Sequence, residues 1–197
     1  MPHEEEALPR RLSPDDLKTL LEATPSEHRL LVDLALTTGL RFGELKRLTW
    51  SHVVWKPRPH LALEGTKSGR VRRVPLSLGI VQELRKARVA AREVLVLPNC
   101  PRNTMALRKR IRKTTGLQLR FHDLRHTFAS RYVESGGSLA MLQLILGHST
   151  SRMTERYARS SDSAMFLDAE RVFQAQSATE VVTGVVSPGT DWAEGEA

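Results

Sequence analysis

Two histidines, an arginine and a tyrosine near one another in this sequence could carry out phosphoryl-transfer chemistry. His122 and Arg125 stand three residues apart in the segment FHDLRHTFASRY, so on a helix they share one face. His148 follows a Leu-Gly step, and Tyr157 lies nine residues further on, among several arginines. A tyrosine hydroxyl beside histidines and positive charge is typical of a nucleophile that attacks a phosphodiester.

Cleavage of a phosphodiester by a tyrosine sets three tasks. The charge on the non-bridging oxygens must be neutralised, and Arg41 and Arg125 suit this because a guanidinium stays charged and donates two parallel hydrogen bonds. The leaving oxygen needs a proton, which Lys67 could supply if its pKa were lowered by nearby arginines. The tyrosine must also lose its proton. His122 and His148 could each accept that proton or hold the phosphate, and the sequence does not separate these roles.

The histidines and Arg125 fall on helices that the hydrophobic periodicity predicts. Leu124, Phe128 and Tyr132 recur every four residues and give the first helix an apolar face. A Gly-Gly pair ends this helix. The next apolar run, residues 139–146, ends at another glycine, which places His148 at the start of a loop.

The N-terminal part of the chain is expected to begin with a linker or flexible arm, residues 1–12. Ser13, followed by proline and two aspartates, is a strong helix start, and a second helix is expected over residues 27–38. Arg41 then stands between two glycines. The spacing alone favours a surface arginine paired with Glu44 over a functional residue.

Three short segments rich in Val and Leu, residues 52–55, 60–64 and 70–75, are expected to be strands. Residues 65–69 form a hairpin tip between the last two, and Lys67 is held there between glycines. A loop lysine taken alone is usually an ordinary solvent-exposed side chain.

Two further helices are expected in the middle of the chain. Residues 77–92 would bury Val81, Leu84 and Val89. Residues 103–115 are strongly basic and include Arg108, Lys109 and Arg112. This second helix could lie along a DNA groove or simply present a solubilising face, and both interpretations stay open.

The charge distribution favours a polyanionic partner. The 197 residues carry a net charge of +8, and the pI is about 10.2. Residues 66–92 hold eight Lys/Arg and one acid, and residues 102–131 hold nine Lys/Arg and one acid, whereas residues 162–197 are acidic. Either basic block alone could be a solvated surface. Two blocks beside the histidines indicate a nucleic-acid groove.

Cysteine usage and hydropathy exclude several classes of protein. Cys100 is the only cysteine, so an internal disulfide or a thiolate cluster is impossible, which fits a reducing compartment. The sequence shows neither an apolar run of membrane-spanning length nor a signal peptide before the charged start. We therefore expect a cytoplasmic protein with no membrane partner.

Several motifs together resemble the catalytic domain of the tyrosine recombinases, the phage integrase family. They are TGLRFGEL at residues 38–45, TKSGRVRRVPL at 66–76, HDLRH at 122–126, LGH at 146–148 and YAR at 157–159. Each motif is weak alone, but together they stand in the family order. The resemblance implies an α+β, mainly α-helical fold, with a small three-stranded antiparallel sheet. It covers the chain from about residue 12 to residue 173.

The resemblance also implies an activity and a site. The function would be site-specific DNA recombination, through a covalent 3′-phosphotyrosine intermediate and a free 5′-hydroxyl, without cofactor or metal. The implied catalytic residues are Arg41, Lys67, His122, Arg125, His148 and the nucleophile Tyr157. The partner would be double-stranded DNA, with Arg70, Arg72, Arg108, Lys109 and Arg112 as DNA-binding residues. The family acts as a homotetramer on paired sites, and this chain alone is expected to be a monomer.

The domain expected for catalysis is residues 13–175. Since the family usually carries a further N-terminal DNA-binding domain, the chain is expected to be either a fragment or a minimal protein. Residues 162–174 read as one more amphipathic helix, which could dock on its own domain or on a neighbouring protomer. Residues 176–197 are small, polar and acidic, and we expect them to be disordered.

Three other interpretations compete with a recombinase. A type IB topoisomerase uses a related catalytic core and similar tyrosine chemistry. His122 and His126 stand four apart and could bind zinc, although no further ligand has a supporting spacing. A DNA-binding module without catalysis would also explain the basic blocks, but it would not require Tyr157.

Overall fold

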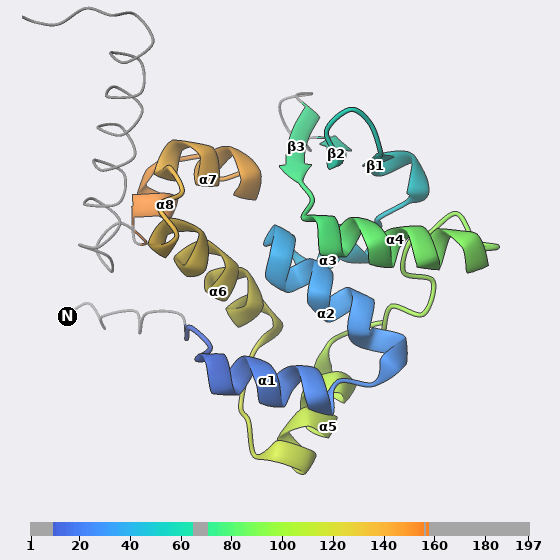
Figure 1. The fold of residues 1–197 in the computed structure, drawn as a ribbon. Helices are drawn as coiled ribbons and strands as arrows, with labels where there is room; N and C mark the ends of the chain where they lie inside the picture. The colour runs from blue at the N-terminus through green and yellow to red at the C-terminus, as the bar shows by residue number, and fades with distance from the viewer. Residues whose placement is uncertain (1–9, 65–70, 156, 158–197) are drawn as a thin grey trace, which may run out of the picture.

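A computed structural model describes residues 10–64, 71–155 and 157, and Figure 1 shows its arrangement. In chain order the elements are α1 (Pro14–Ala23), α2 (Ser26–Thr38), α3 (Phe42–Lys46), a 3-10 turn (Trp50–His52), β1 (Val53–Val54), β2 (His60–Glu64), β3 (Val71–Pro75), α4 (Leu78–Ala90), α5 (Met105–Thr115), α6 (Phe121–Glu134), α7 (Leu139–Leu146) and α8 (Arg152–Glu155). The mainly α-helical α+β fold with a three-stranded antiparallel sheet is therefore confirmed.

The sheet is an antiparallel meander in the order β1-β2-β3. Leu61 pairs with Val53 on one side and with Val74 on the other, and all three side chains are buried. Strand β1 is shorter than residues 52–55 because His52 ends the 3-10 turn, where its ring Nδ1 accepts a hydrogen bond from the Thr49 backbone N–H. The β2–β3 register pairs Glu64 with Val71.

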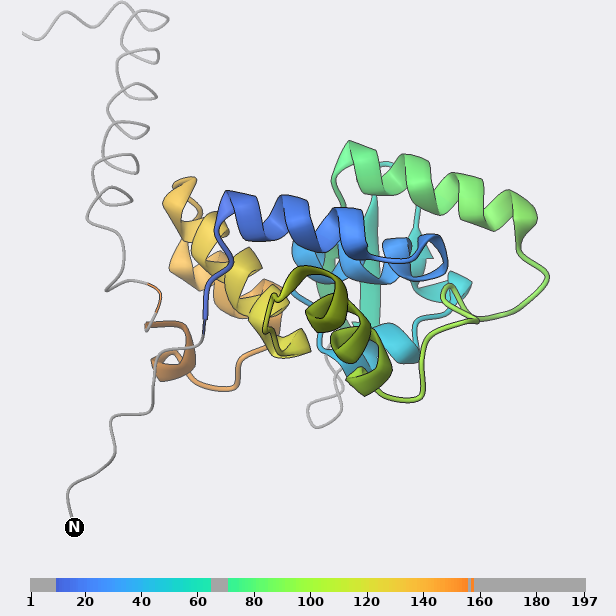
Figure 2. The same cartoon turned by 90° about the horizontal axis from the view of Figure 1, so that it is seen from below.

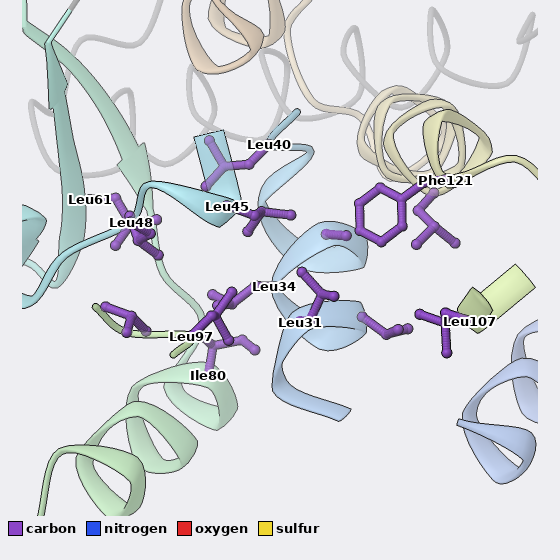
Figure 3. Close-up of a cluster of buried hydrophobic side chains, with 14 of the residues drawn as sticks. Leu31, Leu34, Leu40, Leu45, Leu48, Leu61, Ile80, Leu97, Leu107 and Phe121 are labelled. Carbon is purple, nitrogen blue, oxygen red and sulfur yellow. The ribbon is translucent and has the colours of Figure 1, made fainter. Parts of the chain in front are cut away.

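One large hydrophobic core lies around α2, which packs against α3, α4 and α6 (Figure 3). Leu31 and Leu34 of α2 belong to one buried cluster with residues of α3, β2 and α4, including Leu45, Leu61 and Ile80. Two views at right angles show the sheet and α4 on one side of α2 and helices α6 and α7 on the other (Figures 1 and 2). The core therefore joins the strand half and the C-terminal helix half of the molecule.

The prediction that Val89 of α4 is buried was wrong. Val89 is 90% exposed, whereas Val81 and Leu84 are buried as expected. At about 100° per residue, Val89 lies about 140° around the helix axis from Leu84. It therefore faces solvent near the helix end.

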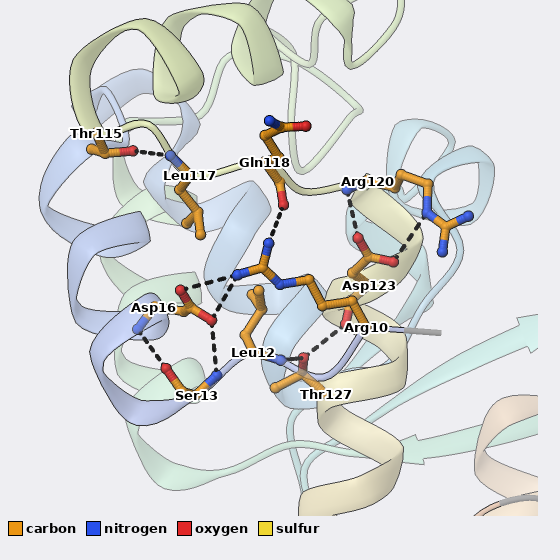
Figure 4. A network of polar contacts seen from close by, with 10 residues as sticks. All are labelled: Arg10, Leu12, Ser13, Asp16, Thr115, Leu117, Gln118, Arg120, Asp123 and Thr127. Carbon is orange, nitrogen blue, oxygen red and sulfur yellow. Dashed lines mark hydrogen bonds and ion pairs between the residues drawn. The ribbon is translucent and has the colours of Figure 1, made fainter. Parts of the chain in front are cut away.

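The packed part of the chain begins before α1 (Figure 4). Leu12 is 1% exposed, and its backbone N–H donates to the Thr127 hydroxyl at 3.0 Å. Arg10 donates to the Gln118 carbonyl at 2.8 Å and forms an ion pair with Asp16. These contacts tie the start of α1 to α6 and to the segment that precedes it.

Ser13 starts α1 as the sequence predicts. The Asp16 backbone N–H donates to the Ser13 hydroxyl at 3.0 Å, and the Ser13 backbone N–H donates to the Asp16 carboxylate at 3.2 Å. This reciprocal capping box satisfies two amides at the helix start.

Two expectations for the end of the chain, the helix over residues 162–174 and the disordered tail over residues 176–197, lie outside the described residues. None of the helices in the described ranges is long and apolar enough to span a bilayer.

Candidate active site

Helix α6 presents His122, Arg125 and His126 on one face, because they stand at positions i, i+3 and i+4. The helix start is fixed by Asp123, which is 2% exposed and accepts a 2.6 Å hydrogen bond from the Arg120 backbone N–H. Leu124 is 1% exposed and packs into the main core. The buried residues of α6 therefore fix its rotation about the helix axis. This rotation directs His122, Arg125 and His126 to the same side of the helix.

Arg125 is the buried centre of the site, with an exposed fraction of 3%. Its Nη1 donates to the Gly39 carbonyl at 2.7 Å, just after α2. Its Nη2 donates to the Leu146 carbonyl at 2.8 Å, at the end of α7. The guanidinium thus joins the C-terminal ends of two helices, where free carbonyls carry partial negative charge.

Arg72 of β3 reaches the same place from the sheet. Its Nη1 also donates to the Leu146 carbonyl at 2.8 Å, and its Nη2 lies 2.9 Å from Glu44 Oε1. Within the described residues its buried Nε has no hydrogen-bond partner. The guanidinium is largely buried, so in this structure Arg72 holds the end of α7 and Glu44 in place.

Arg41 is the more exposed arginine of the group. It is the N-cap of α3, and its backbone N–H donates to Glu44 Oε2 at 2.8 Å, while its Nη1 lies 3.5 Å from Glu44 Oε1. The pairing expected from the spacing is therefore present, and the same carboxylate also binds Arg72. Glu44 holds two arginines of the site at once.

The electrostatics of this group favour an anion. Burial, followed by the charge of Arg41, lowers the pKa of Arg125 to about 10, and Glu44 only partly opposes this. Burial would raise the pKa of Glu44, but hydrogen bonds from Arg72 and the Arg41 backbone hold it below its ordinary value. Arg41 and Arg72 therefore pair with one carboxylate, which also acts on Arg125, and a bound anion would relieve the repulsion among the three guanidinium groups.

His122 lies at the edge of this positive group. Burial, then the charges of Arg125 and Arg41, lowers its pKa below the ordinary value of 6.5. Its ring packs edge-on against the His126 ring, with centroids 4.6 Å apart. The neutral form of His122 is therefore favoured in the free protein, and it could hydrogen-bond a phosphate oxygen or accept a proton.

Tyr157 is buried, with an exposed fraction of 5%, in a small hydrophobic cluster with residues of α6 and α7. Its hydroxyl lies 2.6 Å from His126 Nδ1, and His126 is also 5% exposed. The ring centroids of the two residues are 5.8 Å apart. The tyrosine expected to be the nucleophile is therefore in hydrogen-bond contact with a histidine of α6.

His148 connects the end of α7 to the segment that carries Tyr157. Its Nδ1 lies 2.8 Å from the Thr154 hydroxyl in α8, and the Tyr157 backbone N–H donates to the Thr154 carbonyl at 3.0 Å. The backbone N–H of His148 donates to the Gln143 carbonyl. These bonds fix the loop between α7 and α8 and thereby help to position Tyr157.

The structure brings together five of the residues expected at the catalytic site. Arg41, His122 and Arg125 interact electrostatically. Arg125 donates a hydrogen bond to the last carbonyl of α7, and the Tyr157 hydroxyl is hydrogen-bonded to His126 of α6. His148 lies two residues beyond Leu146 and is bonded to the segment that carries the tyrosine. Lys67 lies outside the described residues.

The expected DNA-binding residues divide into groups. Arg70 lies outside the described residues, and Arg72 is turned inward. Lys109 and Arg112 are exposed on α5, where they could meet a polyanion, and Arg108 uses its Nε to bind the Leu119 carbonyl at 2.8 Å.

Two residues with clear roles in this geometry were not predicted as site residues. Glu44 was considered only as the partner of Arg41, and His126 only as a zinc ligand with His122. The i+4 spacing of His126 was a usable signal, because it places this residue on the face of His122 and Arg125. In the part of the chain that the structure describes, no three His, Cys, Asp or Glu side chains gather as a metal site.

The chain is similar to known proteins in both sequence and fold. The model of the Phage integrase family matches residues 10–164. Tyrosine recombinase XerA of Pyrococcus furiosus is 27% identical over 166 residues, which are 77% of this chain and 58% of that protein. The integrase of Haemophilus phage HP1 is 39% identical over 135 residues, which are 68% of this chain and 37% of that protein. The chain thus spans about three fifths or less of the length of these curated relatives.

Solved structures show the same fold. The catalytic domain of bacteriophage HP1 integrase superposes with a TM-score of 0.64 at 29% identity, over 81% of this chain and 93% of that one. A lambda integrase dimer bound to a COC′ core site gives a TM-score of 0.60 at 26% identity, over 75% of this chain and 47% of that one.

Proposed function

Because the chain belongs to the Phage integrase family of tyrosine recombinases, we propose that it is the catalytic domain of a site-specific DNA recombinase. Tyrosine recombinases break and rejoin DNA strands. In this proposal residues 13–175 contain the catalytic machinery. The substrate is a phosphodiester of double-stranded DNA, and the intermediate is a 3′-phosphotyrosine with a free 5′-hydroxyl.

The observation that carries this proposal is the group of arginines beside a hydrogen-bonded tyrosine. Arg125, with its pKa lowered to about 10, is both buried and short of negative partners, so a phosphate beside it gains strong charge-assisted hydrogen bonds. Tyr157 meets the same helix through His126. A binding module without catalysis would not require this tyrosine.

The proposed roles follow from the chemistry of each group. Arg41 and Arg125 neutralise the non-bridging oxygens, and donors placed for developing charge are worth about 2.7–4 kcal/mol each in comparable sites. Lys67 protonates the leaving 5′-oxygen. His122 and His148 bind the phosphate, and Tyr157 attacks phosphorus. The phosphotyrosine conserves the energy of the broken bond, so religation needs no cofactor.

Double-stranded DNA is the proposed partner for two reasons. The lambda integrase structure that shares this fold is bound to a DNA core site, and this chain carries a charge of +8. Strand exchange would require four protomers on paired sites. The chain alone is proposed to be a monomer that binds DNA weakly and with strong salt dependence, because one domain neutralises few phosphates.

A nicked suicide substrate tests the proposal. The unmodified chain should become covalently attached to DNA, whereas Tyr157→Phe should bind DNA nearly as well and form no adduct, because only the hydroxyl is lost. Tyr132→Phe is the matched control, since Tyr132 is the other tyrosine of the chain, and it should still form the adduct. An adduct that persists in Tyr157→Phe would refute the assignment.

Further assays separate the competing functions. Relaxation of supercoiled DNA without strand exchange would favour a topoisomerase-like enzyme, and binding without any adduct would favour a non-catalytic module. Gel shifts over a salt series, beside a two-site recombination assay, test the weak monomeric binding. Tight, sequence-specific binding with efficient strand exchange would show that the chain acts as a complete recombinase.

A further inference from the structure

His126 places a basic nitrogen directly against the hydroxyl of Tyr157. The distance between Nδ1 and the hydroxyl oxygen is 2.6 Å, and both residues are 5% exposed. A phenol hydroxyl is a donor, and a neutral imidazole has one nitrogen that donates and one that accepts. In the tautomer with its proton on Nε2, His126 accepts the Tyr157 hydroxyl hydrogen at Nδ1.

A nucleophile in hydrogen-bond contact with a base, which is itself oriented by a third group, is the recurring arrangement for an activated nucleophile. Here the third group is His122, whose ring packs edge-on against His126 at 4.6 Å, at an interplanar angle of 87°. His126 is also fixed by its place on α6, between the buried Arg125 and Thr127. The imidazole is thus held in one orientation towards Tyr157.

We propose that His126 is the general base that takes the phenol proton of Tyr157 when the hydroxyl oxygen attacks phosphorus. The O–H bond of Tyr157 breaks and an N–H bond forms at His126 Nδ1, while the new O–P bond forms and the P–O5′ bond breaks. The proton for the 5′-oxygen comes from a separate donor, for which Lys67 is proposed above. This assignment rests on the proposed function and adds one catalytic residue to it.

The charges around the pair are compatible with this role once DNA is bound. His122 and Arg125 are on the same helix, and Arg41, Glu44 and Arg72 act on Arg125 from α3 and β3. In the free protein burial, followed by the charges of Arg125 and Arg41, lowers the pKa of the adjacent His122. The phosphodiester brings negative charge to the same place, and this charge grows as the oxygen attacks, so proton transfer to His126 becomes favourable together with the chemical step.

The test compares His126→Ala and His126→Asn with the unmodified chain in single-turnover cleavage of a nicked suicide substrate. General bases contribute about 10²–10⁴-fold, so both variants should form the adduct at least about a hundredfold more slowly while binding DNA normally. Imidazole added to the buffer should partly restore His126→Ala, because it can occupy the vacated space. A substrate with sulfur at the bridging 5′ position should not restore either variant. His28→Asn is the control histidine and should cleave normally.

The opposite result would overturn the assignment. If His126→Asn forms the adduct as fast as the unmodified chain or faster, His126 only holds Tyr157, and another histidine is the base. Absence of rescue by imidazole in a folded, DNA-binding His126→Ala would likewise count against a base at this position.

A measurement without DNA separates this inference from the proposed function. In ¹⁵N NMR of the histidine rings, Nδ1 of His126 should appear as an unprotonated acceptor, and Tyr157→Phe should shift it while Tyr132→Phe should not. If the unmodified chain forms no adduct with any nicked DNA, the recombinase proposal fails even though this shift is seen. If the adduct forms but the shift is absent, the base assignment alone fails.

Discussion

Arg72 and Arg125 donate to the same backbone oxygen, the carbonyl of Leu146, each at 2.8 Å. The two arginines come from β3 and α6, and the carbonyl they share is the last one of α7. Carbonyls at a helix C-terminus lack intrahelical partners and carry partial negative charge, so they attract guanidinium groups. One carbonyl thus joins the sheet, α6 and α7, two residues before His148.

Gly147 is the residue on which this junction depends, and Gly147→Ala should disrupt it. Its φ is +64°, where an L side chain costs about 1–2 kcal/mol. A Cβ there would also overlap the Arg72 guanidinium. We expect unfolding to become easier by more than the conformational cost alone and adduct formation to fall at least about tenfold, as measured by denaturant titration and the suicide-substrate assay.

Gly116→Ala is the matched control for Gly147→Ala. Gly116 also has a positive φ, of 74°, but a Cβ there would meet no atom within 4 Å. Gly116→Ala should therefore lose stability only by the conformational cost of a side chain at positive φ, and its cleavage rate should not change. If Gly147→Ala and Gly116→Ala lose the same stability and cleavage rate, a side chain at position 147 does not displace Arg72.

Glu44→Gln should destabilise the protein by about 1–3 kcal/mol, because it leaves the more exposed Arg41 and the largely buried Arg72 without their carboxylate. Phosphate or DNA should restore part of this stability by supplying another anion. The pKa of Glu44 is lowered in the folded state, so the stability it contributes is present above the ordinary carboxyl range. This stability is lost as the pH falls through the lowered pKa. The free energy of unfolding of Glu44→Gln should therefore depend less on pH in the acid range than that of the unmodified chain.

Thermal or denaturant unfolding over pH measures this effect, and Glu83→Gln is its control. Glu83 pairs with Lys86 at the surface, with side chains 50% and 72% exposed, so its loss should cost about 0–1 kcal/mol. A Glu44→Gln variant as stable as Glu83→Gln would show that the carboxylate is not needed to hold the two arginines.

Arg41→Gln should raise the pKa of His122, because the charge of Arg41 is one of the causes that lower it. NMR titration of the His122 ring measures the change. Arg47→Gln removes a charge at the other end of α3 and should leave the titration of His122 almost unchanged. Bound DNA should also raise this pKa, since it adds negative charge, and binding should strengthen as the pH falls between the free and bound values. If the titration midpoint of His122 is unchanged in Arg41→Gln, the charge of Arg41 does not act on His122.

Lys67→Ala should cleave normal DNA slowly if Lys67 protonates the 5′-oxygen. A substrate with sulfur at the bridging 5′ position leaves without a proton, so it should restore the rate of this variant. The matched comparison is His126→Asn, which the sulfur substrate should not rescue. Failure to rescue Lys67→Ala would move the acid role to a histidine.

The sequence alone determined which residue types carry the chemistry and how each sits in its own segment. His122 and Arg125 share a helix face because the helical repeat is local, and Ser13 starts α1 because a cap needs only the next turn. The paired strands and the fold class followed from local periodicity together with the family resemblance. Val89 was misplaced because a buried helix face is narrower than the apolar pattern of the sequence suggests.

Only the tertiary structure decided which side chains meet. Tyr157 bonds to His126, 31 positions away along the chain, and Arg72 bonds to Leu146, 74 positions away. No local spacing specifies such contacts. They depend on how α6, α7 and β3 are placed relative to one another, and that placement is set by the packing of side chains in two buried clusters.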